Sequence, residues 1–208
     1  MPTLRHITTH AEVLEYHRFR YAIYANSPQS GFLAGAVGFD MDEFDATAIH
    51  FGWYEAEKLI GCVRLLTPIE SAYPLHLFKD LIDEDQTILA HDLLKRTSGE
   101  PPLCEVSRLC LAPEHRSPAS VHEFVLQIIA NAKPVGRDHF VFTCDRSHVP
   151  FWLKLGFTMV DGFKGYKRQR SENDGYLMEA RYADLLRVNK VALQALSLVA
   201  ITTLAVAA

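Results

Sequence analysis

Several features that would assign a common function class are missing from this sequence of 208 residues. Its four cysteines, Cys62, Cys104, Cys110 and Cys144, form no Cys-x-x-Cys pair. This spacing argues against a metal site or a disulfide framework and fits a reducing cytoplasm. Basic residues are not in excess, because 21 Lys and Arg face 25 Asp and Glu, which gives a net charge of −4. A general nucleic-acid-binding protein would carry the opposite balance, so we expect no nucleic-acid partner.

Long apolar segments are also scarce. The polar residues 1–10 predict no secretory signal. The exception is Val191–Ala208, which has no charged residue and follows Arg187 and Lys190. At the helical rise this stretch would extend about 27 Å, the lower limit for crossing a bilayer. We expect the tail, residues 188–208, to contact a membrane, to pack against the domain or a second copy, or to be a disordered end.

One apolar run stands out because it carries charge. Residues 104–111 are β-compatible and end at Ala112-Pro113, which predicts a buried strand. Glu105 and Arg108 interrupt it, and buried ions must be paired, neutralised or used. Their odd spacing would place them on opposite faces of a regular strand. We therefore expect either a bulge near Ser107 that re-aims one of them, or separate roles on the two faces.

The preceding sequence predicts a helix, a loop and an acidic run. Residues 11–24 are amphipathic, and Thr9 is a suitable N-cap. The glycine-containing segment Gly31–Phe39 predicts a loop that is either a lid or a plain connection. Asp40–Asp45 then places four acids in six residues, which folding alone does not require.

A hairpin follows, with strands at residues 48–54 and 59–66 joined by the turn 55–58. Arg64 lies inside its second strand, where it is either an edge residue or a partner of Asp42 or Asp45.

The second half alternates strands and helices, which predicts an α/β domain with a central sheet covered by helices. Residues 74–94 predict irregular surface structure with short helices. The regular elements expected after it are a helix at 121–133 capped by Ser117 or Ser120, a strand at 139–144, a short helix at 150–155 closed by Gly156, and a strand at 158–160.

Two groups of motifs carry a family resemblance. Residues 109–116, followed by a helix, a strand and residues 151–157, resemble the acyl-donor half of the GNAT acyltransferase superfamily. Arg20-Tyr21, Asp42-Glu43-Phe44-Asp45, residues 61–65 and residues 105–109 are similar in order and spacing to acyl-homoserine-lactone (autoinducer) synthases and long-chain N-acyl amino acid synthases.

This resemblance implies a single GNAT-like domain at residues 1–187, a three-layer α/β fold with a mixed central sheet flanked by helices and a bulge near 105–111. It also implies an acyltransferase that moves a fatty acyl group from a thioester of acyl carrier protein or coenzyme A to the amine of an amino acid or related small molecule. The thioester would be a cosubstrate, with no permanently bound cofactor and no metal.

The resemblance also implies roles for individual residues. The amine must lose a proton, and the tetrahedral oxyanion needs hydrogen-bond donors. The phosphate of the acyl donor needs a binding site. We expect catalytic roles for Glu105, Asp45 and Arg108, with Glu105 or Asp45 as base; acceptor binding by Arg20, Asp42 and Arg64; and donor binding by Leu109, Leu111, Arg116, Ser117 and Ser120. Tyr166 is a candidate proton donor to the departing thiol.

The sequence departs from the lactone synthases in one respect, because residues 24–40 contain no tryptophan. This absence favours an amino acid over S-adenosylmethionine as acceptor. The phosphate loop also lacks a glycine-rich signature, which favours a carrier-protein donor over acetyl transfer. Residues 164–170 form a basic run that is either a carrier docking patch or a solvated face. The alternatives are a lactone synthase and a non-catalytic module that binds acyl thioesters. We expect a cytoplasmic location, and membrane association through residues 191–208 is one of the three alternatives for the tail.

Overall fold

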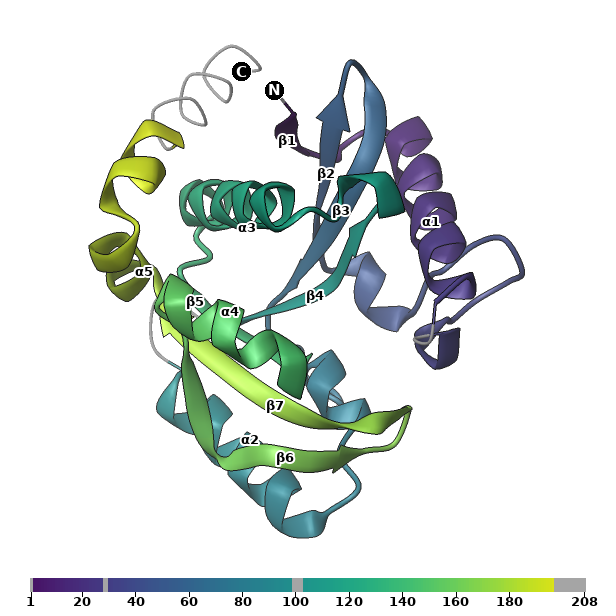
Figure 1. Ribbon diagram of the computed structural model, residues 1–208. Helices are drawn as coiled ribbons and strands as arrows, with labels where there is room; N and C mark the ends of the chain where they lie inside the picture. Colours follow the sequence, from purple (N-terminus) through teal and green to yellow (C-terminus); the bar gives the residue numbers. More distant parts are fainter. Residues whose placement is uncertain (1, 28–29, 99–102, 197–208) are drawn as a thin grey trace. The chain divides into compact units, whose positions relative to one another are not determined.

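The computed structural model describes residues 2–27, 30–98 and 103–196 of the protein (Figure 1). The chain forms two compact units. The first contains Met1–Leu66 and Val106–Ile128, and the second contains Thr67–Glu105 and Ile129–Ala208. The division therefore falls inside the charged strand that the sequence singles out. The predicted domain boundary at residue 187 stays a prediction.

The strands are β1 (Thr3–His6), β2 (Ile49–Glu55), β3 (Lys58–Leu66), β4 (Leu103–Leu111), β5 (His139–Asp145), β6 (Thr158–Arg168) and β7 (Ser171–Arg181). The α-helices include α1 (His10–Ala25), α2 (Glu84–Arg96), α3 (Pro118–Ala132), α4 (Val149–Leu155) and α5 (Tyr182–Val188). Short 3-10 turns include η1 (Ser30–Phe32), η2 (Glu43–Ala46) and η3 (His76–Lys79).

The seven strands form one mixed sheet in the order β1-β2-β3-β4-β5-β7-β6. The strands β4 and β5 run parallel over Leu103–Glu105 and His139–Val141. The pairs β1–β2, β2–β3, β5–β7 and β6–β7 are antiparallel. A mixed open sheet with flanking helices confirms the predicted α/β fold class.

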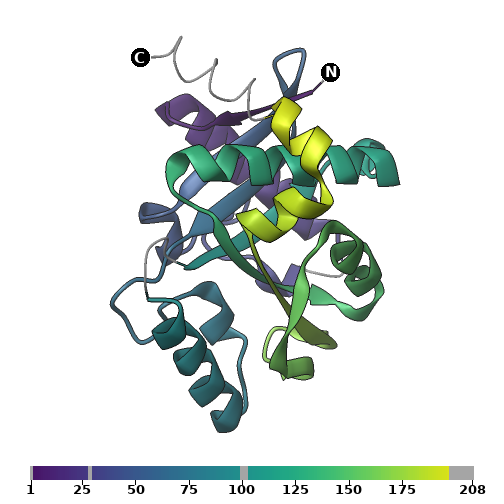
Figure 2. The same ribbon diagram turned by 90° about the vertical axis from the view of Figure 1, so that its left-hand side faces the viewer.

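The first unit is layered, with α1 and α3 on opposite sides of β2 and β3 (Figures 1 and 2). On the α3 side, the rings of Trp53 and Phe124 stack with centroids 4.9 Å apart. The predicted hairpin is confirmed, and its turn residues Ala56 and Glu57 have φ of 45° and 66°. Positive φ at both central positions is the geometry of a type I′ turn, whose twist matches that of the strands.

The second unit places the β6–β7 hairpin between α2 and α4 (Figures 1 and 2). The helix α4 ends as predicted at Gly156, whose φ of 99° allows its amide and that of Phe157 to bond the last helical carbonyls. The ring of Trp152 on α4 packs on Phe142 of β5, with centroids 4.4 Å apart.

Two sequence-based expectations for this unit are only partly right. Residues 74–94 contain the expected short helices, η3 and the start of α2, but they are not all surface structure, because Leu75, Leu77 and Phe78 are buried. Asp83 starts α2 by accepting hydrogen bonds from the amides of Asp85 and Gln86.

The strand expected at 158–160 extends to Arg168, and the sequence reading missed its partner β7 entirely. The basic run 164–170 belongs to this hairpin. Within it, Lys167, Arg168 and Arg170 pair with Asp174, Asp145 and Asp80. These ion pairs neutralise most of the run, which favours the solvated-face interpretation over a docking patch.

The C-terminal tail is described only in part. Residues 190–196 are helical, and Leu193 is fully buried. The rest of the predicted tail, residues 197–208, lies outside the described residues. Within residues 2–27, 30–98 and 103–196, no helix is both long and apolar enough to cross a membrane.

Candidate functional site: a buried arginine–aspartate network

The helix α1 delivers Arg20 to the interior of the first unit. Thr9 and Glu12 form a reciprocal capping box, which fixes where the helix begins. From this start Tyr16, Arg20 and Tyr24 lie four residues apart on one buried face. The Arg20 side chain is completely buried, so its charge must be met by protein groups.

The acidic run meets that charge. Asp42 is the N-cap of η2, accepting from the amide of Phe44, while the Asp45 carboxylate accepts from the Asp42 amide at 2.8 Å. This reciprocal capping fixes both carboxylates without any ion pair. The structural reason for an acid-rich segment is therefore a rigid 3-10 turn that holds its carboxylates in defined directions.

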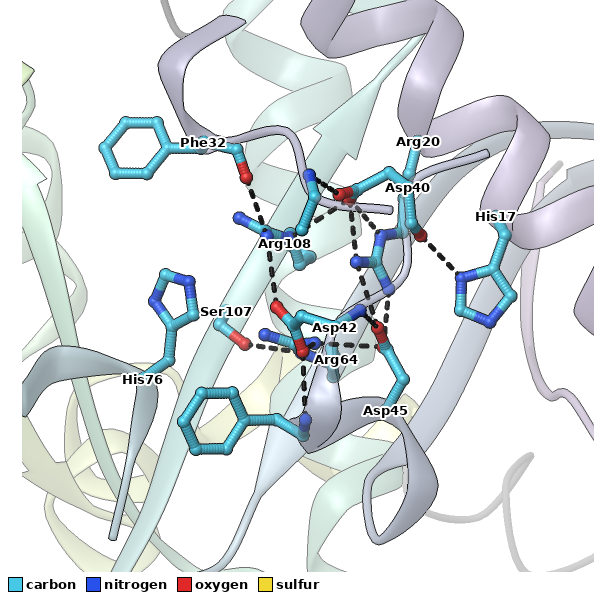
Figure 3. A network of polar contacts seen from close by, with 12 residues as sticks. His17, Arg20, Phe32, Asp40, Asp42, Asp45, Arg64, His76, Ser107 and Arg108 are labelled. Atoms are coloured by element: carbon cyan, nitrogen blue, oxygen red, sulfur yellow. Dashed lines mark hydrogen bonds and ion pairs between the residues drawn. The ribbon is translucent and has the colours of Figure 1, made fainter. Parts of the chain in front are cut away.

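Arg20 bridges two of these carboxylates (Figure 3). Its Nε and Nη2 lie 2.8 and 2.7 Å from Asp40 Oδ2, and its Nη1 lies 2.6 Å from Asp45 Oδ1. A planar guanidinium suits this double engagement, which a lysine could not reproduce.

Arg64 on β3 and Arg108 on β4 complete the network (Figure 3). Arg64 Nη1 lies 2.6 Å from Asp42 Oδ1 and 2.9 Å from Asp45 Oδ1, and its Nε donates to Ser107 Oγ. Arg108 Nη2 lies 3.1 Å from Asp42 Oδ2, and Arg108 Nε lies 3.2 Å from an Asp40 oxygen. Three arginines thus face three aspartates, and the cluster carries no net charge.

A strand irregularity aims Arg108 into this cluster. Its φ is 53°, in the left-handed region that costs a residue with a Cβ about 1–2 kcal/mol. This confirms the break in regular geometry that the charged strand predicts near Ser107. The same guanidinium donates to the Phe32 carbonyl at 2.8 Å, which ties the 31–39 segment to the network.

Burial opposes charge at Asp45 and at Arg64, yet the ion pairs prevail at both. At Asp45, burial works against ionisation, but Arg64 and Arg20 hold the pKa of the carboxyl well below its ordinary value. At Arg64, burial is likewise outweighed by Asp45 and Asp42, which raise its pKa. Asp45 and Arg64 are therefore ionised across the physiological pH range.

Two histidines form hydrogen bonds with backbone carbonyls of the acidic segment. His17 Nδ1 lies 2.7 Å from the Asp40 carbonyl, and His50 Nε2 lies 3.1 Å from the Asp45 carbonyl. Burial lowers the pKa of both rings, that of His50 to about 4. Each is thus neutral and donates from the nitrogen that faces the carbonyl.

The structure therefore brings together five predicted residues, Arg20, Asp42, Asp45, Arg64 and Arg108. Sequence reasoning assigned no role to Asp40, Ser107 or the two histidines. Asp40 could have been recognised from the sequence as a member of the network, since it begins the acidic run. Ser107 could not, because its contact with Arg64 depends on how the strands pair.

Glu105 lies in the second unit, where it is buried and its Oε2 accepts from the Leu77 amide at 3.2 Å. Its participation beside the network stays a prediction. In the same unit Tyr166 is buried, with its hydroxyl 2.5 Å from Thr143 Oγ1. Burial raises the pKa of this phenol, which keeps it protonated.

The predicted donor-binding residues lie at the end of β4 and the start of α3. Arg116 Nε donates to the Leu111 carbonyl at 3.0 Å. Ser117 caps α3, because its Oγ accepts from the Ser120 amide at 3.1 Å. The donor role of these residues, and of Leu109, stays a prediction. Within the described part of the chain, no cluster of His, Cys, Asp or Glu could hold a metal ion.

Residues 19–125, which contain the whole network, match the model of a family described as an acetyltransferase (GNAT) domain. The chain belongs to this family. The GNAT fold and this match identify the protein as an acyltransferase. No curated protein matches the sequence.

Solved GNAT-like structures share the fold at low sequence identity. FeeM, an N-acyl amino acid synthase from uncultured soil microbes, superposes with a TM-score of 0.64 at 18% identity, covering 92% of this chain and 97% of that one. BjaI, a CoA-dependent acyl-homoserine lactone synthase, gives 0.67 at 14% identity over 92% and 90% of the two chains. The AHL synthase LasI gives 0.66 at 13% identity over 93% and 94%.

Proposed function

We propose that this GNAT protein is an N-acyltransferase that moves a fatty acyl group from an acyl-carrier-protein or coenzyme A thioester to the amine of an amino acid or related small molecule. The observation that carries the proposal is the buried arginine–aspartate network, which far exceeds what the strands and turns need for capping. Likeness to FeeM and to the lactone synthases supports the same reaction class.

The network offers a specific place for the acceptor. Arg64 Nη2 is buried and has no hydrogen-bond partner among the described residues, although the rest of its guanidinium is engaged. An unpaired buried donor on a cation costs free energy unless a ligand completes it. A carboxylate of the acceptor would do so through a charge-assisted hydrogen bond. Asp42, whose side chain is 6% exposed, would hold the ammonium group.

The two candidate bases are not equivalent. Asp45 is clamped by two arginines and its pKa is far below neutrality, so it is a weak base. We therefore assign it to positioning, through Arg20 and Arg64, and keep Glu105 as the group that removes the ammonium proton, directly or through water. The amine then attacks the thioester carbonyl, a C–N bond forms, and the C–S bond breaks as the thiolate leaves and takes up a proton.

The acyl donor would bind at the end of β4 and the start of α3. Amides near Leu109 and Leu111 would stabilise the oxyanion. Arg116 and the capped start of α3 at Ser117 and Ser120 would hold the donor phosphate, because a helix N-terminus favours an anion.

A second acceptor, S-adenosylmethionine, is retained because BjaI and LasI are acyl-homoserine lactone synthases with the same fold. It shares with amino acids the α-carboxylate and α-ammonium groups that the network would bind. The absence of tryptophan from residues 24–40 favours the simple amino acids.

The test measures thiol release by the purified full chain from dodecanoyl carrier protein and dodecanoyl-CoA, with each amino acid or S-adenosylmethionine as acceptor. We expect acceptor-dependent release that falls at least 100-fold in Glu105→Gln, because loss of a general base typically costs 10²–10⁴-fold. Glutamine retains an oxygen for the Leu77 amide, so the variant should stay folded. Removing Asp45 is a poorer test, since unpaired Arg20 and Arg64 would cost about 3–5 kcal/mol of stability.

Glu57→Gln is the matched control, because Glu57 is an exposed carboxylate in the β2–β3 turn that pairs with Arg5 and lies outside the proposed site. It should retain wild-type release. Thioester binding without release for every acceptor would contradict the proposed function, as would full activity in Glu105→Gln.

A further inference from the structure

A groove on the second unit takes no part in the proposed reaction. It consists of three adjoining cavities of about 340, 360 and 390 Å³. Glu179 of β7 lines all three, Arg96 lines the first and second, and Thr158 lines the first and third. The shared residues place the three cavities next to one another along β6 and β7, beside α2 and α5, and together they are called the groove below. Each cavity alone falls in the range of roughly 300–1,000 Å³ that is typical of small-molecule sites.

The middle of the groove contains an unsatisfied buried group. His139 lines the first cavity and is only 4% exposed, yet its Nδ1 has no hydrogen-bond partner in the described part of the chain. It lies opposite Arg181 in the β5–β7 ladder. Burial, together with Arg181 and Arg96, lowers the pKa of His139, so the ring is neutral and able to donate one hydrogen bond.

The charged side chains that line the first cavity with His139 are two arginines and two carboxylates, and both carboxylates already have ion-pair partners. Glu179 pairs with Arg96 at 3.3 Å, and Asp184 pairs with Arg187. Arg181 lines the same cavity and forms no ion pair with any described residue. An anionic group is therefore the ligand that the centre of the groove can complement.

Apolar side chains form part of the two outer cavities, beside charged residues such as Asp92, Asp161 and Arg187. Leu89, Leu93, Met159 and Phe163 line the second cavity, and Ala180 and Val188 line the third. Leu89 and Val188 are 41% and 56% exposed, which is unusual for large apolar side chains in a concave surface. A chain of methylene groups would cover them.

We propose that this groove binds a long-chain carboxylate, with its head on Arg181 and His139 Nδ1 and its chain along the apolar arm from Leu89 to Phe163. Two sources share this chemistry. One is a free fatty acid, and the other is an N-acyl amino acid, whose relevance rests on the proposed function. Binding to the groove is an equilibrium property, so its test is independent of catalytic turnover.

The test is isothermal titration of the full chain with dodecanoate, N-dodecanoylglycine and dodecanol, the two carboxylates below their micelle concentrations and dodecanol below its solubility limit. Both carboxylates should bind, and dodecanol should bind at least tenfold more weakly. Arg181→Gln should weaken the carboxylates roughly tenfold, because a hydrogen bond to a charged group is lost, and Leu89→Asp should weaken all three ligands. Arg181 is exposed, so its replacement should not disturb folding.

Arg18→Gln is the matched control, since Arg18 is an exposed arginine on α1 in the first unit. It should leave every affinity unchanged. Tighter binding of N-dodecanoylglycine than of dodecanoate would identify the N-acyl amino acid as the source, and the reverse order the free fatty acid. Carboxylate affinities within twofold of wild type in Arg181→Gln would overturn the proposal, because the ligand would then bind elsewhere.

Discussion

Arg64 illustrates at the residue scale the reason for proposing that this network binds a ligand. Its Nη1 and Nε are engaged by Asp42, Asp45 and Ser107, while its Nη2 is buried and has no hydrogen-bond partner in the part of the chain that the structure describes. Buried ion pairs seldom stabilise a fold more than apolar residues of the same volume, because desolvation offsets their attraction. The ligand role proposed above accounts for these buried charges and for the open Nη2 of Arg64 together.

The histidines give the network a pH dependence of stability. Burial lowers the folded-state pKa of His50 to about 4, although Asp45 pulls the other way, while Arg20 and His17 lower it further. The unfolded chain has a value near 6.5. Because the unfolded state binds more protons between these values, the contribution of neutral His50 is fully present above pH 6.5 and is lost as pH falls towards 4.

We therefore expect wild type to lose about 2 kcal/mol of unfolding free energy from this residue between pH 7 and pH 5. His50→Gln, which keeps a donor but cannot be protonated, should lose correspondingly less over the same interval. Urea denaturation at the two pH values measures both. The exposed His10→Gln serves as control, and an unchanged pH dependence in His50→Gln would show that this ring does not carry the effect.

At the scale of elements, sequence patterns predicted those helix ends and turns that depend only on neighbouring residues. The cap of α1 at Thr9, the β2–β3 hairpin and the left-handed end of α4 at Gly156 all follow from neighbouring residues, and all are confirmed. The strand β7 was missed because its charged, glycine-containing sequence resembles a surface segment. Its strand geometry depends on pairing with β5 and β6, which local sequence does not reveal.

The β2–β3 turn provides a test at this scale. Ala56 has a φ of 45°, which glycine adopts without the Cβ penalty. Ala56→Gly should therefore leave stability unchanged or raise it by up to about 1 kcal/mol, whereas glycine in the exposed interior of α1, at Ala22, should cost about 1 kcal/mol. Thermal unfolding distinguishes the two. Equal destabilisation by both substitutions would contradict the type I′ assignment.

At the scale of the whole molecule, the acidic run, Arg20, Arg64 and Arg108 are scattered over 89 positions of the sequence, from 20 to 108, and only the fold joins them. The sequence predicted which side chains carry charge in apolar surroundings. It could not predict which arginine pairs with which aspartate, because the contacts of Arg108 with Asp40 and Asp42 depend on its positive φ in β4. The family match over residues 19–125 and the sheet order establish the GNAT fold.

The most direct test of acyl transfer to an amine follows the nitrogen atom. The purified full chain is incubated with dodecanoyl thioester and a mixture of all twenty ¹⁵N-labelled amino acids, and the extract is examined by mass spectrometry. We predict an N-dodecanoyl amino acid that carries the ¹⁵N label and identifies the acceptor by its mass. Release of dodecanoate and free thiol with no ¹⁵N-labelled amide would contradict the account.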